Sequence, residues 1–137
     1  MTKLEVAALY AGLNILILLF LAARVPLMRR RLRVSLGDGG HFELQRAVRA
    51  HGNAAEYVPA GVAALLFLAL LDAVALQTVH VLGAGFTAGR ALHAWGLSVQ
   101  APNAGPPPGR FIGMVLTFAA YAGFAAALLW GAVAATL

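Results

Sequence analysis

Four long apolar segments constrain the fold of this chain more than any other feature. They cover residues 4–27, 44–71, 73–97 and 111–135. Each exceeds the roughly 20 residues that an α-helix needs to cross about 30 Å of hydrocarbon. Because a bilayer core offers no water to unpaired backbone groups, such segments must be helical. The sequence therefore predicts an all-α integral membrane protein, built as a bundle of four transmembrane helices.

The composition agrees with this class and limits the number of domains. Apolar residues make up 61% of the chain and charged residues 11%, which is about half the charged fraction of a typical soluble domain. Four spanning helices use nearly all of the 137 residues. We therefore expect one four-helix membrane domain over residues 1–137, with no room for a separate soluble domain.

The arginines predict the orientation in the membrane. Seven arginines flank the first connection, Arg110 flanks the third, and the second contains only Asp72. The positive-inside rule then places the first and third connections in the cytoplasm and both termini outside it. The basic cluster at residues 29–33 also favours a retained first helix over a cleaved signal peptide. The same arginines can anchor this end of the helix to anionic lipid headgroups. Nucleic-acid binding is not expected, because the basic residues lie at the edge of the bilayer.

Polar side chains of the second segment gather on one side of the expected helix. Steps of three, four and three residues separate Arg46, Arg49, Asn53 and Glu56, which places them within an arc of about 80°. Charged groups at the edge of and inside a bilayer are costly and usually functional. These four side chains can therefore converge on one ligand.

The third segment contains further polar groups at a similar depth. Arg90 lies seven residues before Leu97, and Glu56 lies seven residues beyond Arg49 on the antiparallel neighbour. Glu56 and Arg90 can form a structural ion pair, or both can contribute to a polar site at that depth. His93 can donate a hydrogen bond to a ligand or bond a neighbouring carbonyl.

Glycine and proline predict two features of helix packing. Gly83, Gly85, Gly89 and Gly96 suggest a small-residue face that lets another helix approach closely. Pro59 should kink or loosen the second helix, and a neighbouring helix must then satisfy the freed carbonyl.

The second segment resembles the signature of the MAPEG superfamily, the membrane-associated proteins of eicosanoid and glutathione metabolism. That pattern, Arg-x-x-Arg-Ala-x-x-Asn-x-x-Glu-Tyr-x-Pro, is matched here by Arg46, Arg49, Ala50, Asn53, Glu56, Tyr57 and Pro59. The similarity extends to residues 32–35 and 89–96 and to the four-helix layout. It is closest to a small bacterial branch of the superfamily.

The resemblance implies a homotrimer that binds glutathione between subunits near the cytoplasmic side. The implied glutathione-binding residues are Arg49, Asn53, Glu56 and Tyr57, joined by Arg30, Arg46, Arg90 and His93. This set suits glutathione, which has two carboxylates for arginines to bind and one ammonium for a carboxylate to bind.

The resemblance also implies that an arginine near the start of helix four stabilises the glutathione thiolate. Arg110 is the candidate at that boundary, and its alternative role is a membrane anchor. The chain has no cysteine, so the reacting thiol must come from glutathione. His93 and Leu97 stand where eicosanoid-making relatives have tyrosines, which argues against a leukotriene-type substrate.

The function expected from these observations is a membrane-bound glutathione transferase or peroxidase that acts on lipophilic electrophiles, in a bacterial inner membrane. Its partners would be glutathione, a lipophilic small molecule, membrane lipids and further copies of the chain. A non-catalytic scaffold that binds glutathione or lipid is the main alternative. A b-type haem or quinone protein using His51 and His93 is a weaker one, and no metal or haem is expected.

Overall fold

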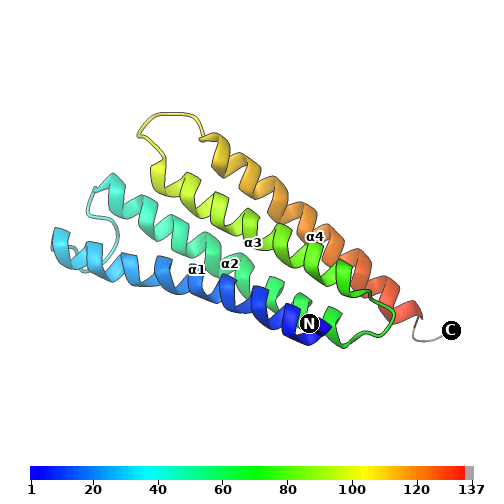
Figure 1. The fold of residues 1–137 in the computed structure, drawn as a ribbon. Coiled ribbons are helices and arrows are strands. Elements are labelled where there is room, and N and C mark those ends of the chain that lie inside the picture. The colour runs from blue at the N-terminus through cyan, green and yellow to red at the C-terminus, as the bar shows by residue number, and fades with distance from the viewer. Residues whose placement is uncertain (135–137) are drawn as a thin grey trace.

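The computed structural model describes residues 1–134 and forms four helices over this part of the chain. They are α1 (Lys3–Leu32), α2 (Phe42–Leu70), α3 (Leu76–Val99) and α4 (Pro108–Ala134). Figure 1 shows them as one elongated antiparallel bundle. Helices α2 and α3 each contact all three other helices, whereas α1 and α4 do not contact each other. The predicted all-α class and the four-helix layout are confirmed.

Three of the four helices are long and apolar enough to cross a membrane: α1, α2 and α4. Helix α3 has 24 residues, which corresponds to about 36 Å, but it is not apolar enough along its length. His80, Arg90 and His93 lower its mean hydropathy. The prediction that four segments are long enough to span holds for the length of α3, whereas only α1, α2 and α4 are also apolar enough. The contacts of α3 with all three other helices explain why it tolerates these polar residues.

The helix boundaries differ from the predicted ones at several ends. Helix α1 continues to Leu32, so the basic cluster lies on the last helical turns and not in a loop. A capping box between Thr2 and Glu5 begins α1, and Arg33 ends it in the left-handed conformation, with φ of 56°. Helix α4 begins at Pro108, a position where proline is favoured because its missing N–H has no intrahelical partner.

The α2–α3 connection is longer than predicted, because α2 ends at Leu70 and α3 begins at Leu76. The predicted end of the fourth helix, residue 135, lies outside the described residues. These shifts move helix ends by a few residues and leave the order of the helices unchanged.

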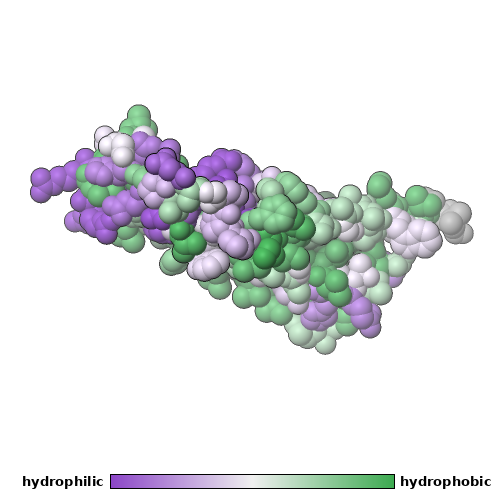
Figure 2. Space-filling view, turned by 90° about the horizontal axis from the view of Figure 1, so that it is seen from above, coloured by the Kyte–Doolittle hydropathy of each residue, from purple (hydrophilic) through white to green (hydrophobic). Residues whose placement is uncertain are grey.

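Apolar side chains form two separate clusters along the bundle. One cluster, near the α2–α3 connection, contains large residues, including Leu65, Leu68, Val79, Phe86 and Phe124. The other, toward the opposite end, is built largely from smaller residues and contains Leu21, Ala50, Ala54, Val58, Ala94 and Leu97. Figure 2 shows hydrophilic residues concentrated at this second end of the molecule. Smaller core residues there leave room for buried polar side chains.

Helices α3 and α4 approach each other closely through glycine. A Cβ atom at Gly89 would lie 2.9 Å from the backbone nitrogen of Thr117, and one at Gly96 would overlap the backbone of Arg110. Gly113 of α4 similarly faces the backbone of His93. No larger residue fits at these positions without separating the two helices.

The four glycines of α3 do not share one face, contrary to the prediction. Gly83 packs against the ring of Tyr10 from α1, and Gly85 has open space where a Cβ atom would lie. Only Gly89 and Gly96 belong to the contact with α4.

Helix α2 continues through Pro59 without interruption. The Tyr121 hydroxyl of α4 donates a hydrogen bond of 2.5 Å to the Tyr57 carbonyl. A neighbouring helix therefore bonds this turn at the Tyr57 carbonyl. The prediction concerned a different carbonyl, that of Ala55, which loses its usual partner to the proline.

Gly89→Ala should destabilise the protein by about 1–3 kcal/mol, because the added methyl group overpacks the α3–α4 contact. Thermal unfolding in detergent measures this effect. Gly85→Ala is the matched control on the same helix and should leave the melting temperature unchanged or raise it, since alanine favours helix. Equal melting temperatures for the two variants would show that the α3–α4 contact is not tight.

Candidate functional site

The guanidinium of Arg90 links three helices and is 1% exposed. Its Nη2 donates to Oδ1 of Asn53 on α2 at 2.6 Å, and its Nη1 donates to Oγ1 of Thr117 on α4 at 3.4 Å. The ring of Tyr57 lies beneath the guanidinium, with 5.2 Å between the Arg90 Cζ and the ring centroid. All of these partners are neutral, and Arg90 forms no ion pair within residues 1–134.

A small cavity of about 30 Å³ lies beside this cluster. Asn53, Tyr57, Arg90 and His93 line it, together with Met114, Thr117 and Phe118 of α4. Nε of Arg90 and Nδ1 of His93 are buried and make no hydrogen bond with the described residues. Unsatisfied polar atoms of this kind are rare in native interiors. These two nitrogens can therefore form hydrogen bonds at the inner end of the site.

A larger pocket of about 210 Å³ lies closer to the polar end of the bundle. It brings Arg46, Arg49 and Arg110 together with Gln100, and Phe42, Gln45 and Leu97 complete the lining. Arg46 donates to the Gln100 carbonyl at 2.7 Å, and Arg110 lies 3.5 Å from the Gln100 Oε1. Gln100 therefore holds two of the three arginines. A pocket with this charge is suited to an anion.

Arg110 also borders a third cavity, of about 290 Å³, on its other side. Pro106 and Phe111 line this cavity, and it shares Gln100 with the arginine pocket and Met114 with the inner cavity. Arg110 thus lines both the arginine pocket and the cavity that contains Pro106 and Phe111.

Arg49 and Glu56 pair with each other on the outer surface of α2. The distance between Nη1 of Arg49 and Oε1 of Glu56 is 3.4 Å, and their side chains are 60% and 53% exposed. Arg90 bonds Asn53 and not Glu56, so the Glu56–Arg90 ion pair, one of the two predicted alternatives, does not form in the described structure. Glu56 remains available to a ligand at the surface.

The predicted polar face of α2 is therefore divided by depth. Asn53 points into the bundle, Arg46 is half-buried, and Arg49 and Glu56 are exposed. The four side chains thus share one side of the helix but differ in burial, which the angular arc alone does not distinguish.

Arg30 is not part of this group. It is exposed on the last turns of α1, and α1 does not contact α4. Of the nine predicted site residues, eight thus lie in the inner cavity, in the arginine pocket or in the adjoining Arg49–Glu56 pair.

Two polar residues of the site were not predicted from the sequence. Thr117 bonds Arg90 and also donates to the Gly113 carbonyl at 2.8 Å, and Gln100 orients Arg46 and Arg110. Thr117 is the one threonine of α4 and lies in an otherwise apolar stretch, which is a usable signal. Gln100 follows the end of α3, and no sequence pattern marks it as a site residue. Among residues 1–134, no three metal-binding side chains of the His, Asp or Glu type gather at one place.

Asn53→Leu should lower the free energy of unfolding by about 1.5–3 kcal/mol, because it removes the acceptor of a buried, charged donor. Asn53→Asp is the informative partner variant, since it supplies a carboxylate to an unpaired guanidinium and should unfold at a higher temperature than Asn53→Leu. Thermal unfolding of both in detergent tests this. Equal losses would show that the Arg90 charge is already compensated.

Comparison with known proteins places this geometry in a family. The family model for MAPEG matches residues 7–130. Two similar relatives are the Inner membrane protein YecN of Escherichia coli strain K12 and that of strain O6:H1. Each is 43% identical over 91 residues, which is 66% of this chain and 69% of the relative. The residues of the inner cavity, the arginine pocket and the Arg49–Glu56 pair lie within the matched range, and the chain belongs to the MAPEG family.

Proposed function

We propose that this protein is a membrane-bound, glutathione-dependent transferase or peroxidase that acts on lipophilic electrophiles. The observation that carries the proposal is the buried Arg90 charge with neutral partners only, beside a pocket with three further arginines. A charge buried in this way is costly without an anionic partner. A bound ligand with carboxylates would supply that partner.

The charges of glutathione match the site in number and sign. Its two carboxylates can bind to arginines of the pocket, Arg46 and Arg49, or deeper to Arg90. Its single ammonium can bind to Glu56, whose carboxylate is exposed and only loosely paired at 3.4 Å. The amide of Asn53 and the ring of Tyr57 would contact the peptide backbone.

Arg110 is the proposed catalytic residue. A guanidinium beside a thiol favours the thiolate form, which is the nucleophile. The thiolate sulfur would attack the electrophilic carbon, form the C–S bond and displace the leaving group with its electron pair. Arg110 borders both the arginine pocket and the cavity lined by Phe111 and Met114. The second cavity would hold the lipophilic substrate, and His93 can donate a hydrogen bond from the inner side.

A homotrimer with the ligand between subunits is part of the proposal. Arg49 and Glu56 are exposed on α2, so a ligand bound there is only partly enclosed by one subunit. Arg30 lies on α1, away from α4 and the pocket beside it. In an oligomer, Arg30 of a neighbouring subunit can complete the site.

The proposed membrane location rests on the relatives and on the apolar helices. Both relatives are named as inner membrane proteins, and three helices here are long and apolar enough to span a bilayer. We propose a bacterial inner membrane, with the arginine-rich end in the cytoplasm and both termini on the other side.

One observation favours the non-catalytic alternative, a glutathione- or lipid-binding scaffold. Arg110 contacts Gln100, which also bonds Arg46, so Arg110 already has a structural role at the end of α3. Glutathione binding measured by calorimetry, followed by a conjugation assay on the same purified protein, separates the two functions. Binding with turnover supports the enzyme, and binding without turnover on a broad set of electrophiles supports the scaffold.

Arg49→Ala should weaken glutathione binding by about 1.5–3 kcal/mol, the usual contribution of a charge-assisted hydrogen bond. Calorimetry on the detergent-solubilised protein measures this. Arg31→Ala is the matched control, because Arg31 is equally exposed and is also paired with a carboxylate, that of Glu43 at 2.7 Å. It should have little effect. Equal losses from both substitutions would mean that a diffuse basic surface, and not this pocket, attracts the ligand.

Arg110→Ala should reduce turnover far more than glutathione affinity, because a group that stabilises the thiolate acts mainly on the reactive state. The ultraviolet absorbance of the bound thiolate should fall in parallel. Arg110→Lys should restore only part of the activity, since an ammonium lacks the planar fork. Unchanged turnover and absorbance in Arg110→Ala would show that Arg110 is only a membrane anchor. Arg90 and His93 would then be the candidates for the residue that stabilises the thiolate.

A further inference from the structure

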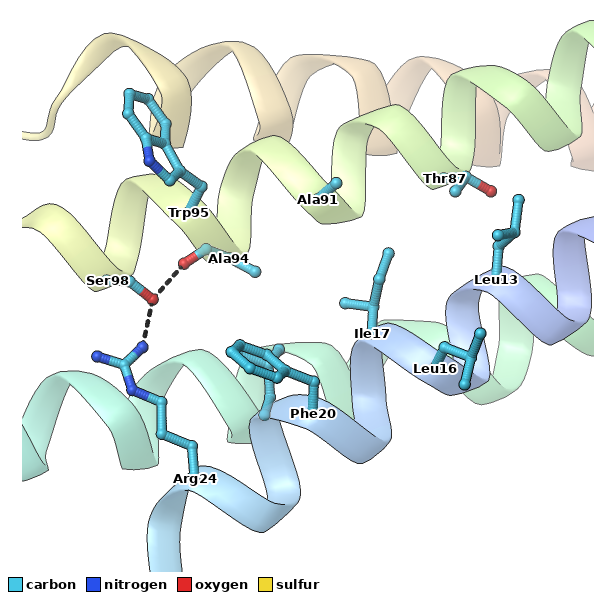
Figure 3. A pocket seen from close by; sticks show the side chains of 11 residues that line it. Leu13, Leu16, Ile17, Phe20, Arg24, Thr87, Ala91, Ala94, Trp95 and Ser98 are labelled. Carbon is cyan, nitrogen blue, oxygen red and sulfur yellow. Dashed lines mark hydrogen bonds between the residues drawn. The ribbon is translucent and has the colours of Figure 1, made fainter. Parts of the chain in front are cut away.

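A separate groove lies between α1 and α3, on the side of α3 away from α4. It has a volume of about 610 Å³ and runs along α3 from Thr87 to Ser98 (Figure 3). This separation of eleven residues corresponds to about 16 Å along the helix. One leaflet of the hydrocarbon core is about 15 Å deep, half of the full thickness. The groove therefore has the length of a single leaflet.

The walls of the groove are apolar and open toward the lipid. Leu13, Leu16 and Phe20 of α1 are 40%, 61% and 67% exposed, and Trp95 of α3 is 59% exposed. Ala91 lines the groove from α3, between Trp95 and Thr87, and has only a small side chain (Figure 3). Such a surface is suited to a flexible acyl chain.

The end of the groove is cationic. Nη1 of Arg24 donates to the Ser98 hydroxyl at 2.7 Å, and that hydroxyl donates to the Ala94 carbonyl at 2.8 Å (Figure 3). No ion pair of Arg24 occurs among residues 1–134. Arg31 lies two turns further along α1 and lines an adjoining cavity with Arg24, but Glu43 already pairs with it. Arg24 is thus the unpaired charge at the mouth of the groove.

We propose that this groove binds one anionic phospholipid, with one of its two acyl chains along Leu16, Phe20 and Ala91 and its phosphate on Arg24. The charge argues for this occupant. A cation at the leaflet edge attracts a lipid with net negative charge more strongly than a zwitterionic lipid, whose ammonium offsets its phosphate. An uncharged helix of another copy would leave the cation unpaired. This site is specific, unlike a general attraction of the basic α1 end to the membrane surface. It does not depend on the glutathione proposal.

Native mass spectrometry of the full, detergent-solubilised chain tests the headgroup. The probes are phosphatidylglycerol and phosphatidylcholine with identical acyl chains. Phosphatidylglycerol should bind more tightly, and Arg24→Gln should reduce this preference by about fivefold, the effect of one basic residue near an anionic surface. Arg33→Gln is the charge-matched control, because Arg33 is exposed at the same end of α1 and does not line the groove. Equal reductions, or equal binding of both lipids, would overturn the proposal.

A second pair of variants tests the position of the acyl chain. Ala91→Phe fills the groove and should reduce bound phosphatidylglycerol, whereas Ala88→Phe adds the same bulk at an exposed position of α3 outside the groove and should not. Melting temperatures identify any loss caused by misfolding. Equal effects would place the lipid elsewhere. A cross-link between copies through Ala91→Cys, in a chain with no cysteine of its own, would show that a second copy occupies the groove and would also overturn the proposal.

Discussion

The hydrogen bond between Arg90 and Asn53 is the interaction on which the functional end of this bundle depends. It joins α3 to α2, while the second bond of the same guanidinium, to Thr117, reaches α4. Because each partner is neutral, these bonds position the arginine without neutralising it. A buried charge held in this state stabilises an anion more strongly than an exposed one does. The same residue therefore organises three helices and prepares a binding site.

The rest of the architecture supports that arrangement. The large aromatic and aliphatic residues form the cluster that extends from Phe86, one turn before Arg90, toward the α2–α3 connection, and they fix the helices there. At the arginine end, the small cluster residues Ala50, Ala54 and Ala94 leave space for polar side chains. The residues that stabilise the bundle and those that form the site thus lie at different depths in the membrane.

The fold was largely predictable because membrane helices are specified by length and apolarity. The four helices and their order followed from the apolar segments, and the candidate residues of α2 followed from the motif. The side-chain partner of Arg90 was less predictable. Glu56 and Arg90 lie at matching depths, but a helical arc does not tell whether a side chain faces the core or the surface, and here Asn53 takes the inner position.

Other features depend on tertiary contacts that no local pattern contains. The roles of Gln100 and Thr117 arise only when α3 and α4 are packed together. The glycines of α3 divide between two neighbours because Gly83 meets Tyr10 of α1 while Gly89 meets Thr117. Spacing along one helix predicts which residues share a direction, but not which helix lies in that direction.

The central claim is that Arg90 and the arginines of the adjoining pocket bind the carboxylates of a ligand. The most direct measurement is the melting temperature of the full, detergent-solubilised chain with glutathione and, separately, with glutathione whose two carboxylates are both esterified. A ligand that binds the native state raises the melting temperature in proportion to its affinity. We expect glutathione to raise it and the diester to leave it unchanged. An equal rise with both compounds, or no rise with glutathione, would contradict the claim.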